Sequence, residues 1–383
     1  MNRKKIVFWL PCYPDVMYSF IEELSRREEN DLTVVCLSDL PEERREIYEQ
    51  NTLGKMCRIV ICSEEISLSE NVKKIISDNI DAVHIFGGFL GRVGEVLNHY
   101  RDFGYKKAII ITEKPSVVPS KYFGGIIKAL KKARSKRVYG KRYKSIKECV
   151  AAVFVTGKSG VEQLASYGVP RDKLYRFMYT HIDEDITLKE LSVGNPVKFV
   201  YVGRFDYLNR GVDTLKYVFD NVKHENWCLD LVGGYGRDSE AIKKWASSRR
   251  GVSFIGSWKN NEVINKLADY DVCISPTRID GWRIQVNQAI MAGIGTITTN
   301  EAVSDELVAA SRSGAVVRAN KKTQMKRAVE AVLDNPNIVI DWKKNARDYA
   351  HKITNQAFAD YFLENLEYIF NKQKIEGRPE CPW

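Results

Sequence analysis

Hydrophobic residues along the chain fall into short runs separated by longer stretches with apolar positions at helical spacing. The short runs are rich in β-branched side chains, which is typical of strands buried on both faces of a sheet. In the first half they lie at residues 6–10, 32–37, 58–62, 82–86, 108–112 and 151–156. The stretches between them predict helices at 16–27, 69–78, 91–100, 122–137 and 159–167. This alternation requires crossover connections, and therefore a parallel sheet covered on both faces.

The same alternation restarts after residues 183–195, an acidic and apolar-poor stretch that Pro196 closes. We interpret this stretch as an interdomain linker. Strands are then predicted at 197–202, 227–232, 252–255, 272–275, 295–299 and 314–317. Helices are predicted at 212–222, 239–247, 260–269, 284–292, 304–309 and 322–333.

Two successive units of this kind predict an α/β protein with two Rossmann-like, doubly wound parallel-sheet domains. The length of 383 residues agrees, because it exceeds what one hydrophobic core usually serves. The expected domains are residues 1–185 and 196–340, and a helical region at 341–383 is expected to pack back on the first domain. Ligands of such sheets bind beyond the carboxyl ends of the strands, so the predicted site is a cleft between the two domains.

Composition excludes several classes of protein. A hydrophobic content of 44% with 11% aromatic residues is too high for a disordered chain. The eight cysteines contain no C-x-x-C pair, which argues against a disulfide framework or a zinc site. No apolar run has the length of a signal sequence core or of a spanning helix, so we expect a cytoplasmic protein. We also expect no metal cofactor.

The positive charge of the chain is concentrated in one segment. The formal net charge is +10, from 59 basic and 49 acidic residues. Residues 126–147 contain ten basic residues and no acidic residue, so this segment accounts for the whole excess. A local basic patch of this kind indicates one polyanionic partner rather than a general basic coat.

Apolar positions at helical spacing accompany the basic residues at 122–147, with tyrosines on both sides. A cationic amphipathic helix of this kind suits an anionic membrane surface, and we expect a peripheral position on the inner face of the cell membrane. RNA binding is an alternative, although no RNA-binding motif accompanies the segment. A solvated helix face is the other alternative. The expected membrane-binding residues are Lys128, Lys131, Lys132, Arg134, Lys136 and Arg137.

Candidate chemistry gathers where the strands of the second domain end. The strand at 197–202 runs into Gly203 and Arg204, and Arg210 follows shortly after. A glycine at a strand end lets an anion approach the backbone, and two arginines can neutralise a diphosphate. Surface salt bridging is the alternative role of these arginines. Gly233 ends the next strand in a glycine-rich turn, which suits either a nucleotide loop or a plain β-turn.

Two further strand ends carry candidate residues. Trp258 stands after the third strand, where it can stack on a ligand base or fill the core. Asp280 and Gly281 close a loop just before a predicted helix whose free N–H groups favour a phosphate. Gln288 lies about two turns further along that helix. The alternatives are that Asp280 caps the helix and that Gln288 is a surface residue.

Taken in order, these motifs resemble the C-terminal domain of family 4 glycosyltransferases, the retaining group with a GT-B fold. The resemblance spans roughly residues 196–335, and its order and spacing are more specific than any single motif. It implies that Arg204 and Arg210 bind the donor diphosphate, with Asp280 at the donor sugar. It further implies donor-binding roles at Gly203, Gly233, Trp258, Gly281, Trp282, Arg283, Gln288 and Glu306. Asp280 and Gln288 fall where the family carries two glutamates, and Arg283 falls where it carries a glycine.

The resemblance implies a metal-independent transfer of a sugar, with retention, from a nucleotide diphosphate sugar to an acceptor hydroxyl. We expect the acceptor to be a lipid-linked or surface polysaccharide glycan, and no nucleic acid partner. Two alternatives remain open from the residues alone. One is a GT-B epimerase that isomerises sugar nucleotides. The other is a scaffold protein that binds sugar nucleotides without turnover.

Overall fold

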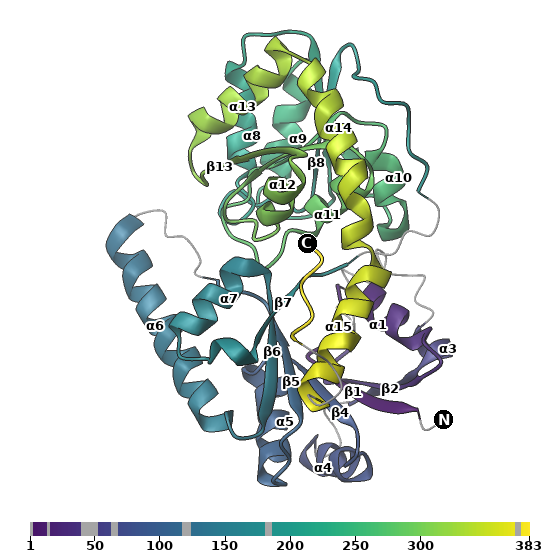
Figure 1. Cartoon of the computed structure of the whole chain (residues 1–383). Coiled ribbons are helices and arrows are strands. Elements are labelled where there is room, and N and C mark those ends of the chain that lie inside the picture. Colours follow the sequence, from purple (N-terminus) through teal and green to yellow (C-terminus); the bar gives the residue numbers. More distant parts are fainter. Residues whose placement is uncertain are drawn as a thin grey trace. The chain divides into compact units, whose positions relative to one another are not determined.

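The computed structural model describes residues 3–13, 16–39, 53–62, 68–116, 124–180, 186–371 and 377–383. Side chains are described for all of these except residues 53–54, 68–69 and 124–128. The chain divides into two compact units (Figure 1). The first unit comprises residues 1–115, 130–180 and 355–382, and the second comprises residues 116–129, 181–354 and Trp383.

The first unit is built on a seven-stranded parallel sheet in the order β3-β2-β1-β4-β5-β6-β7. The interior strand β1 is buried on both faces, since Ile6, Val7, Phe8 and Trp9 are all at most 1% exposed. The continuous apolar runs of the sequence therefore predicted the type of sheet correctly. The strands are β1 (Lys4–Leu10), β2 (Asn30–Cys36), β3 (Arg58–Ile61), β4 (Val83–Gly87), β5 (Ala108–Thr112), β6 (Val150–Thr156) and β7 (Leu174–Phe177).

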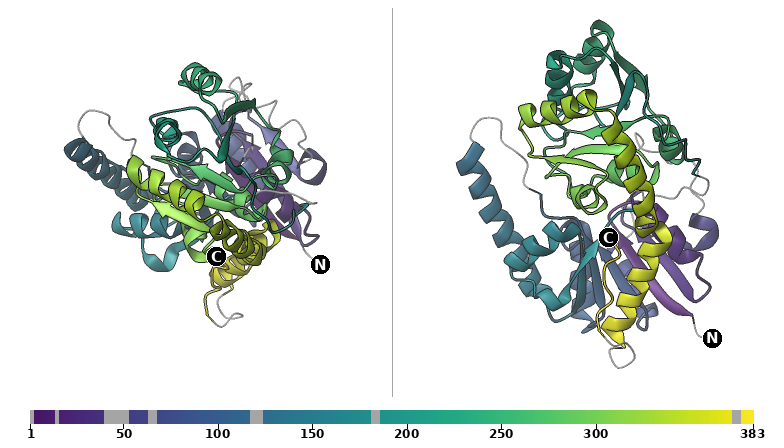
Figure 2. Two further views of the ribbon diagram at one scale, coloured as in Figure 1. Left: turned by 90° about the horizontal axis from the view of Figure 1, so that it is seen from above. Right: turned by 45° about the horizontal axis from the view of Figure 1, so that its top comes forward.

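Helices cover this sheet on both faces, as the views in Figure 2 show. Aromatic side chains join two of these helices. The ring of Phe20 lies 4.8 Å from that of Phe358 and 5.0 Å from that of Phe362. This contact holds α1 against α15. The helices of the unit are α1 (Tyr18–Ser25), α3 (Leu53–Met56), α4 (Leu68–Asp78), α5 (Gly91–Asp102), α6 (Gly124–Ile146, from residue 130 onward), α7 (Gly157–Ser166) and α15 (Asn355–Phe370).

The edge strand β7 and the short helix α3 of the first unit were not predicted. Both are only four residues long, which is too short for a periodic pattern to be recognised. Helix α6 was predicted to end at residue 137, and it continues to Ile146. The added residues include Lys141, Arg142 and Lys144, whose side chains favour helix.

The second unit holds a six-stranded parallel sheet in the order β10-β9-β8-β11-β12-β13. All six strands were predicted, and five have the predicted bounds. The fold class, α/β with two doubly wound parallel sheets, is therefore confirmed. The strands are β8 (Val197–Val202), β9 (Trp227–Val232), β10 (Val252–Gly256), β11 (Val272–Ser275), β12 (Gly295–Thr299) and β13 (Gly314–Val317).

The second sheet is flanked by helices near the predicted positions. Helix α8 packs against α13, and α11 packs against α10, α12 and α14. The predicted helix at 260–269 is a 3-10 turn at Asn260–Glu262 followed by a single helical turn. The helices are α8 (Val212–Asn221), α9 (Ser239–Ser248), α10 (Val263–Leu267), α11 (Ile284–Met291), α12 (Asp305–Ser311), α13 (Lys322–Asp334) and α14 (Asn337–Ala350).

The helical region expected at 341–383 is divided between the two units, which differs from the expectation. Helix α14 packs within the second unit, against α11, α12 and β12. Lys343 of α14 holds it there, because its Nζ lies 2.7 Å from the carboxylate of Asp271 and 2.7 Å from the carbonyl oxygen of Ser192. Helix α15 belongs to the first unit. The amphipathic pattern continues through both helices and does not mark the division between them.

Candidate functional site

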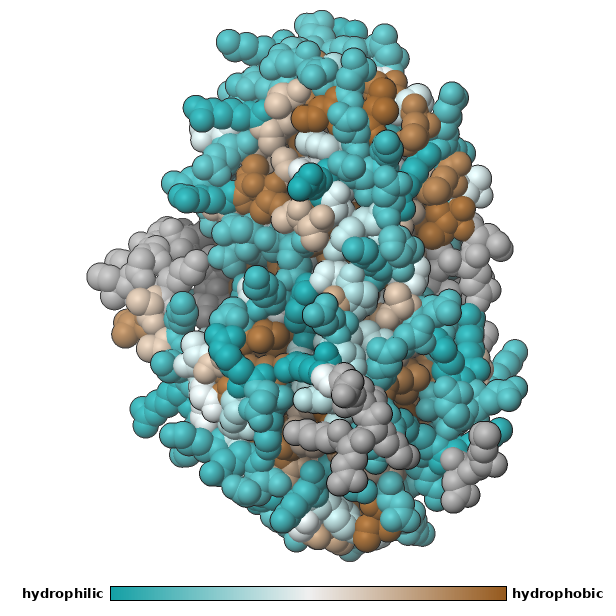
Figure 3. All heavy atoms as spheres, in the orientation of Figure 1, coloured by the Kyte–Doolittle hydropathy of each residue, from teal (hydrophilic) through white to brown (hydrophobic). Residues whose placement is uncertain are grey.

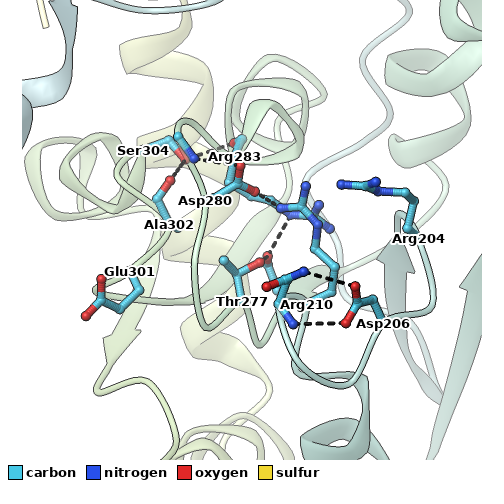
Figure 4. A network of polar contacts seen from close by, with 12 residues as sticks. Arg204, Asp206, Arg210, Thr277, Asp280, Arg283, Glu301, Ala302 and Ser304 are labelled. Carbon is cyan, nitrogen blue, oxygen red and sulfur yellow. Dashed lines mark hydrogen bonds and ion pairs between the residues drawn. The ribbon is translucent and has the colours of Figure 1, made fainter. Parts of the chain in front are cut away.

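The candidate residues of the second unit meet at the carboxyl edge of its sheet. Because all strands of this sheet are parallel, β8, β9, β11 and β12 end at the same edge. Arg204 follows β8, Gly233 follows β9, and Asp280 lies in the loop after β11. Residues that are far apart in the sequence are thereby placed in one polar network (Figure 4).

Two glycines at this edge allow backbone segments to approach one another closely. Gly203 has a φ of 146°, and a Cβ atom on it would lie 2.6 Å from Nη2 of Arg283. Gly233 has a φ of 154°, and its Cβ would collide with the carbonyl oxygen of Gly203. The side chains of other residues are excluded at both positions. Gly233 therefore supports the site by allowing the turn after β9 to pack against the turn after β8.

Arg210 and Asp280 form an ion pair through Nη1 and Oδ2. Both side chains are largely buried, with exposed fractions of 14% and 12%. The other carboxylate oxygen of Asp280 accepts a hydrogen bond of 2.9 Å from the backbone N–H of Gly281. The alternative in which Asp280 caps the following helix is wrong, because α11 begins at Ile284 and no side chain caps it. The alternative of exposed surface salt bridging fails for Arg210 as well.

Two further arginines, Arg204 and Arg283, act on the charge of Arg210 in this ion pair. Figure 4 shows the side chain of Arg204 pointing from β8 toward Arg210. Burial, followed by the positive charges of Arg283 and Arg204, lowers the pKa of Arg210 to about 9. A guanidinium remains protonated at neutral pH under such a shift. The site is consequently rich in positive charge, which suits a ligand with more than one negative charge.

Arg283 is buried beneath the turn after β8, with 3% of its surface exposed. Its Nη2 donates to the carbonyl oxygen of Val202 at 2.6 Å, and its Nε donates to Oγ of Ser275 at 3.1 Å. The guanidinium also lies 5.7 Å from the centre of the Tyr201 ring. Arg283 thus joins the ends of β8 and β11 and directs its charge toward the candidate site.

The loop after β8 is held in place by residues that sequence analysis did not select. Asp206 accepts backbone N–H groups of Leu208 and Asn209 at 2.8 and 3.0 Å. Arg278 donates to the carbonyl oxygen of Tyr207, and its Nη2 lies 2.8 Å from the carboxylate of Asp213. An acidic residue two positions before a turn is a local signal that could have found Asp206. No sequence signal pairs Arg278 with a carboxylate 65 residues away.

Trp282 and Gln288 are both buried in the structure. The indole of Trp282 donates to Oδ1 of Asn287 at 2.9 Å and is 4% exposed, so its side chain supports the turn before α11. Gln288 is 2% exposed, which excludes the surface alternative. Its Oε1 is buried and has no hydrogen-bond partner, so an acceptor is available within the second unit. Such an orphaned acceptor is costly unless a ligand supplies a donor.

Trp258 and Glu306 make contacts with other residues than the ion pair. Trp258 is half-buried, and its ring lies 6.0 Å from that of Tyr270. It is neither a full core aromatic nor an open stacking platform. Glu306 is on α12, and its Oε1 accepts a hydrogen bond of 3.2 Å from the indole of Trp383. The structure therefore brings together Gly203, Arg204, Arg210, Asp280, Gly281 and Arg283.

The basic residues of α6 are presented to solvent. Lys131, Lys132, Arg134, Lys136 and Arg137 are exposed, and the side chain of Lys128 lies outside the described residues. The expected apolar face is interrupted, because Arg134 and Arg137 lie within about 40° of Leu130 around the helix axis. Figure 3 likewise shows separate small hydrophobic groups on the face that it draws.

The aromatic residues expected to flank this helix at its carboxyl end are part of the core. Tyr143 is 4% exposed, and the ring of Tyr139 packs 5.3 Å from that of Phe89. Arg142 donates from Nε to the carbonyl oxygen of Phe89 at 2.7 Å and from Nη1 to Oδ1 of Asn98 at 2.6 Å. The carboxyl half of α6 is therefore anchored to α5, while Lys141 and Lys144 within it remain exposed.

Metal ligation and membrane spanning have no candidates among the described residues. Within those ranges, no group of three or more His, Cys, Asp or Glu side chains is arranged to hold a metal ion. No helix in the described part of the chain is long and apolar enough to cross a membrane.

The second unit matches a known family of domains. Residues 196–335 match the family model of glycosyl transferases group 1. An uncharacterized glycosyltransferase from Methanocaldococcus jannaschii is 25% identical over 173 residues, which cover 44% of this chain and 44% of that relative. The alignment thus spans less than half the length of the relative.

Several solved structures, among them glycosyltransferases, share the fold over nearly the whole chain. A glycosyltransferase from Rickettsia africae has a TM-score of 0.73 at 13% identity, covering 97% of this chain and all of that one. HepE of Anabaena, solved in complex with UDP, has a TM-score of 0.72 at 11% identity over 95% and 99% of the two chains. The galactosyltransferase WaaB has a TM-score of 0.69 at 13% identity over 96% and 99%. The two parallel sheets are therefore those of the GT-B fold.

Proposed function

We propose that this protein is a glycosyltransferase that moves a sugar from a nucleotide diphosphate sugar to an acceptor hydroxyl. The observation that carries the proposal is the convergence of Arg204, Arg210 and Asp280 at the carboxyl edge of the second sheet. This edge lies within the domain that matches glycosyl transferases group 1. A diphosphate fits this edge, because Arg204 and Arg210 supply positive charge for charge-assisted hydrogen bonds.

The difficult step of such a transfer is departure of the nucleoside diphosphate. The bond between the anomeric carbon and the diphosphate oxygen breaks, the acceptor oxygen bonds to that carbon, and the acceptor proton passes to the departing diphosphate. Negative charge develops on the leaving oxygen, where Arg204, Arg210 and the N-terminus of α11 stabilise it. Asp280 accepts a hydroxyl of the donor sugar once the diphosphate takes over Arg210. Retention of configuration is part of the proposal.

Gln288 is proposed to bind hydroxyl groups of the donor. Its Oε1 is an unpaired, buried acceptor, and a ribose or sugar hydroxyl supplies the missing donor. Glu306, on the neighbouring α12, is proposed to contribute a second acceptor near the donor. HepE of Anabaena has been solved in complex with UDP-glucose, which supports a nucleotide sugar as the donor class.

We further propose that the exposed basic residues of α6 attach the protein to an anionic membrane surface. Their exposure and the lack of acidic residues in 126–147 support an electrostatic contact. The interrupted apolar face favours association with lipid headgroups over deep insertion. A membrane position suits a lipid-linked glycan as acceptor, and the cytoplasmic face supplies the nucleotide sugar.

A panel of nucleotide diphosphate sugars tests the donor proposal directly. We expect one of them to raise the thermal unfolding midpoint and to be converted to the free nucleoside diphosphate when a glycan acceptor is present. Isomerisation of the sugar nucleotide without an acceptor would favour the epimerase alternative. Binding without turnover over a broad acceptor panel would favour the scaffold alternative, which Gln288 in place of a carboxylate motivates. Absence of binding to every nucleotide diphosphate would exclude the donor site.

A further inference from the structure

Arg283 carries a buried positive charge that no carboxylate of the described residues neutralises. Its hydrogen-bond acceptors are the carbonyl oxygen of Val202 and the hydroxyl of Ser275, and its other neighbour is the ring of Tyr201. All three partners are neutral. Burying a charge without an opposite charge is costly, and proteins retain such a group where a ligand or metal completes it.

The charge of Arg283 lies against the proposed diphosphate site. The space for its guanidinium exists only because residue 203 is glycine, since Nη2 lies 2.6 Å from where a Cβ would be. Its positive charge is the strongest among the charges that lower the pKa of Arg210. Asp280 pairs with Arg210, so the charges of Arg204 and Arg283 have no carboxylate partner in the described part of the chain. A ligand with two negative charges matches these two positive charges.

The backbone fixes Arg283 at its position below the turn. Its N–H donates to the carbonyl oxygen of Ala302 at 3.0 Å, and its carbonyl oxygen accepts from Oγ of Ser304 at 2.8 Å. With 3% of its surface exposed, the side chain offers almost no area to a ligand in the site. Tyr201, which lies under the guanidinium, donates its O–H to the carbonyl oxygen of Arg204 at 2.6 Å. A chain of contacts therefore leads from Arg283 through Tyr201 to Arg204.

We propose that Arg283 is a positioning residue that acts on the diphosphate from below, without touching it. Through Tyr201 it places the turn that carries Arg204, and its uncompensated charge makes the site selective for a doubly charged diphosphate group. This inference rests on the proposed function. It also assigns Arg283 a role different from the direct donor contact that the resemblance implied.

An electrostatic role and a purely structural role of Arg283 lead to different stabilities of the ligand-free variants. An uncompensated buried charge destabilises the free protein, so a neutral side chain of similar size relieves that cost. The thermal unfolding midpoint of the ligand-free Arg283→Met variant is therefore expected to stay the same or rise, while diphosphate affinity falls. A structural role predicts that both fall together.

The test compares the variants Arg283→Lys, Arg283→Gln and Arg283→Met with the unsubstituted protein. Calorimetric titrations with inorganic pyrophosphate and with UDP measure the affinity of each. Gln and Met are expected to weaken binding on the order of 10-fold or more and to flatten its salt dependence. Lys keeps the charge and is expected to retain most of the affinity. Arg250→Gln, at an exposed position, is the matched control and is expected to bind as the unchanged protein does.

Several outcomes would overturn the proposal. Equal losses of affinity in the Lys and Gln variants would show that the hydrogen bonds of Arg283 matter for binding and its charge does not. Unchanged affinity in the Gln and Met variants would remove the role altogether. If these variants fail to fold, Tyr201→Phe decides, because it breaks the contact with Arg204 and is expected to weaken binding. Wild-type protein that binds neither probe refutes the proposed function itself, whereas weakened binding in Arg204→Ala with intact binding in every Arg283 variant refutes only this inference.

Discussion

At the scale of single residues, Arg204 and Arg210 are the strongest test of the donor site. Arg204→Ala and Arg210→Ala each remove a charge-assisted contact to the diphosphate. We expect each to lower turnover by on the order of 100-fold, the magnitude typical of one preorganised donor. Steady-state assays with the donor found in the panel measure this effect, and circular dichroism confirms folding.

Arg210→Ala is expected to affect the ground state differently from Arg204→Ala. Removing Arg210 leaves the buried carboxylate of Asp280 without its ion pair, so stability is expected to fall as well. The double variant Arg210→Ala/Asp280→Asn is expected to recover part of that stability without recovering activity. Full activity in either single variant would contradict the site.

His84 predicts a dependence of stability on pH in the first unit. It is fully buried, accepts a hydrogen bond of 3.0 Å from the indole of Trp9, and lies 3.0 Å from the carbonyl oxygen of Asn79. Burial lowers the pKa of His84 from 6.5 to about 4. The unfolded chain therefore binds the proton first, and the stabilisation present above pH 6.5 is lost as the pH falls toward 4.

Urea denaturation at several pH values measures this loss. The contribution of His84 is expected to decrease by on the order of 3 kcal/mol over that range. His84→Gln, which does not titrate, serves as the comparison, since all other groups are shared. Parallel pH profiles for the two proteins would show that the His84 ring is not held neutral.

At the scale of elements, the exposed part of α6 carries the membrane prediction. Replacing Lys131, Lys132, Arg134, Lys136 and Arg137 by Ser removes five charges, each worth about 1 kcal/mol at an anionic surface. We expect the variant to lose salt-sensitive sedimentation with phosphatidylserine-containing liposomes. Its stability is expected to change little, because these side chains are exposed.

A matched control keeps the change in net charge and moves it elsewhere. Five exposed basic residues of the second unit serve for this, namely Lys223, Lys244, Arg250, Lys259 and Lys321. Their replacement by Ser is expected to leave sedimentation nearly unchanged. Equal losses in the two variants would mean that net charge alone attracts the protein, and α6 would then have no special role.

The buried pair of Asp271 and Lys343 ties three elements of the second unit together. Asp271 also accepts the backbone N–H groups of Gly194 and Lys198, at 3.1 and 2.8 Å. Lys343→Met leaves this carboxylate buried without its counter-ion. We expect the free energy of unfolding to fall by about 3 kcal/mol, measured by urea denaturation.

The companion variant Asp271→Asn/Lys343→Met removes both charges. It is expected to be more stable than Lys343→Met, because no unpaired charge remains buried. If Lys343→Met had the same free energy of unfolding as the unsubstituted protein, α14 would be held to the second unit by its apolar contacts alone.

At the scale of the whole molecule, the charge of the donor is proposed to be met by arginine side chains. Transfer is accordingly expected to proceed without a divalent cation. Turnover measured in excess EDTA is expected to equal turnover in buffer, and added Mg²⁺ or Mn²⁺ to change it less than about twofold. Loss of activity in EDTA that a divalent cation restores would contradict the metal-independent proposal.

The alternation of apolar runs determined the number, order and type of most elements. Strands such as β8 and β11 were predicted with their observed bounds, because parallel strands buried on both faces leave continuous apolar runs in the sequence. The division between α14 and α15 could not be predicted. Both helices have the same amphipathic period, and which sheet each covers depends on contacts such as that of Lys343 with Asp271.

The amino-acid sequence alone also determined which residue types are available at the carboxyl edge of the second sheet, because the ends of the strands can be predicted from it. Only the tertiary structure decided what each of them does. It paired Arg210 with Asp280, turned Trp282 inward, and placed Arg283 in the space that Gly203 leaves. These outcomes depend on distances across strands that lie tens of residues apart in sequence, and periodicity along the chain carries no information about such distances.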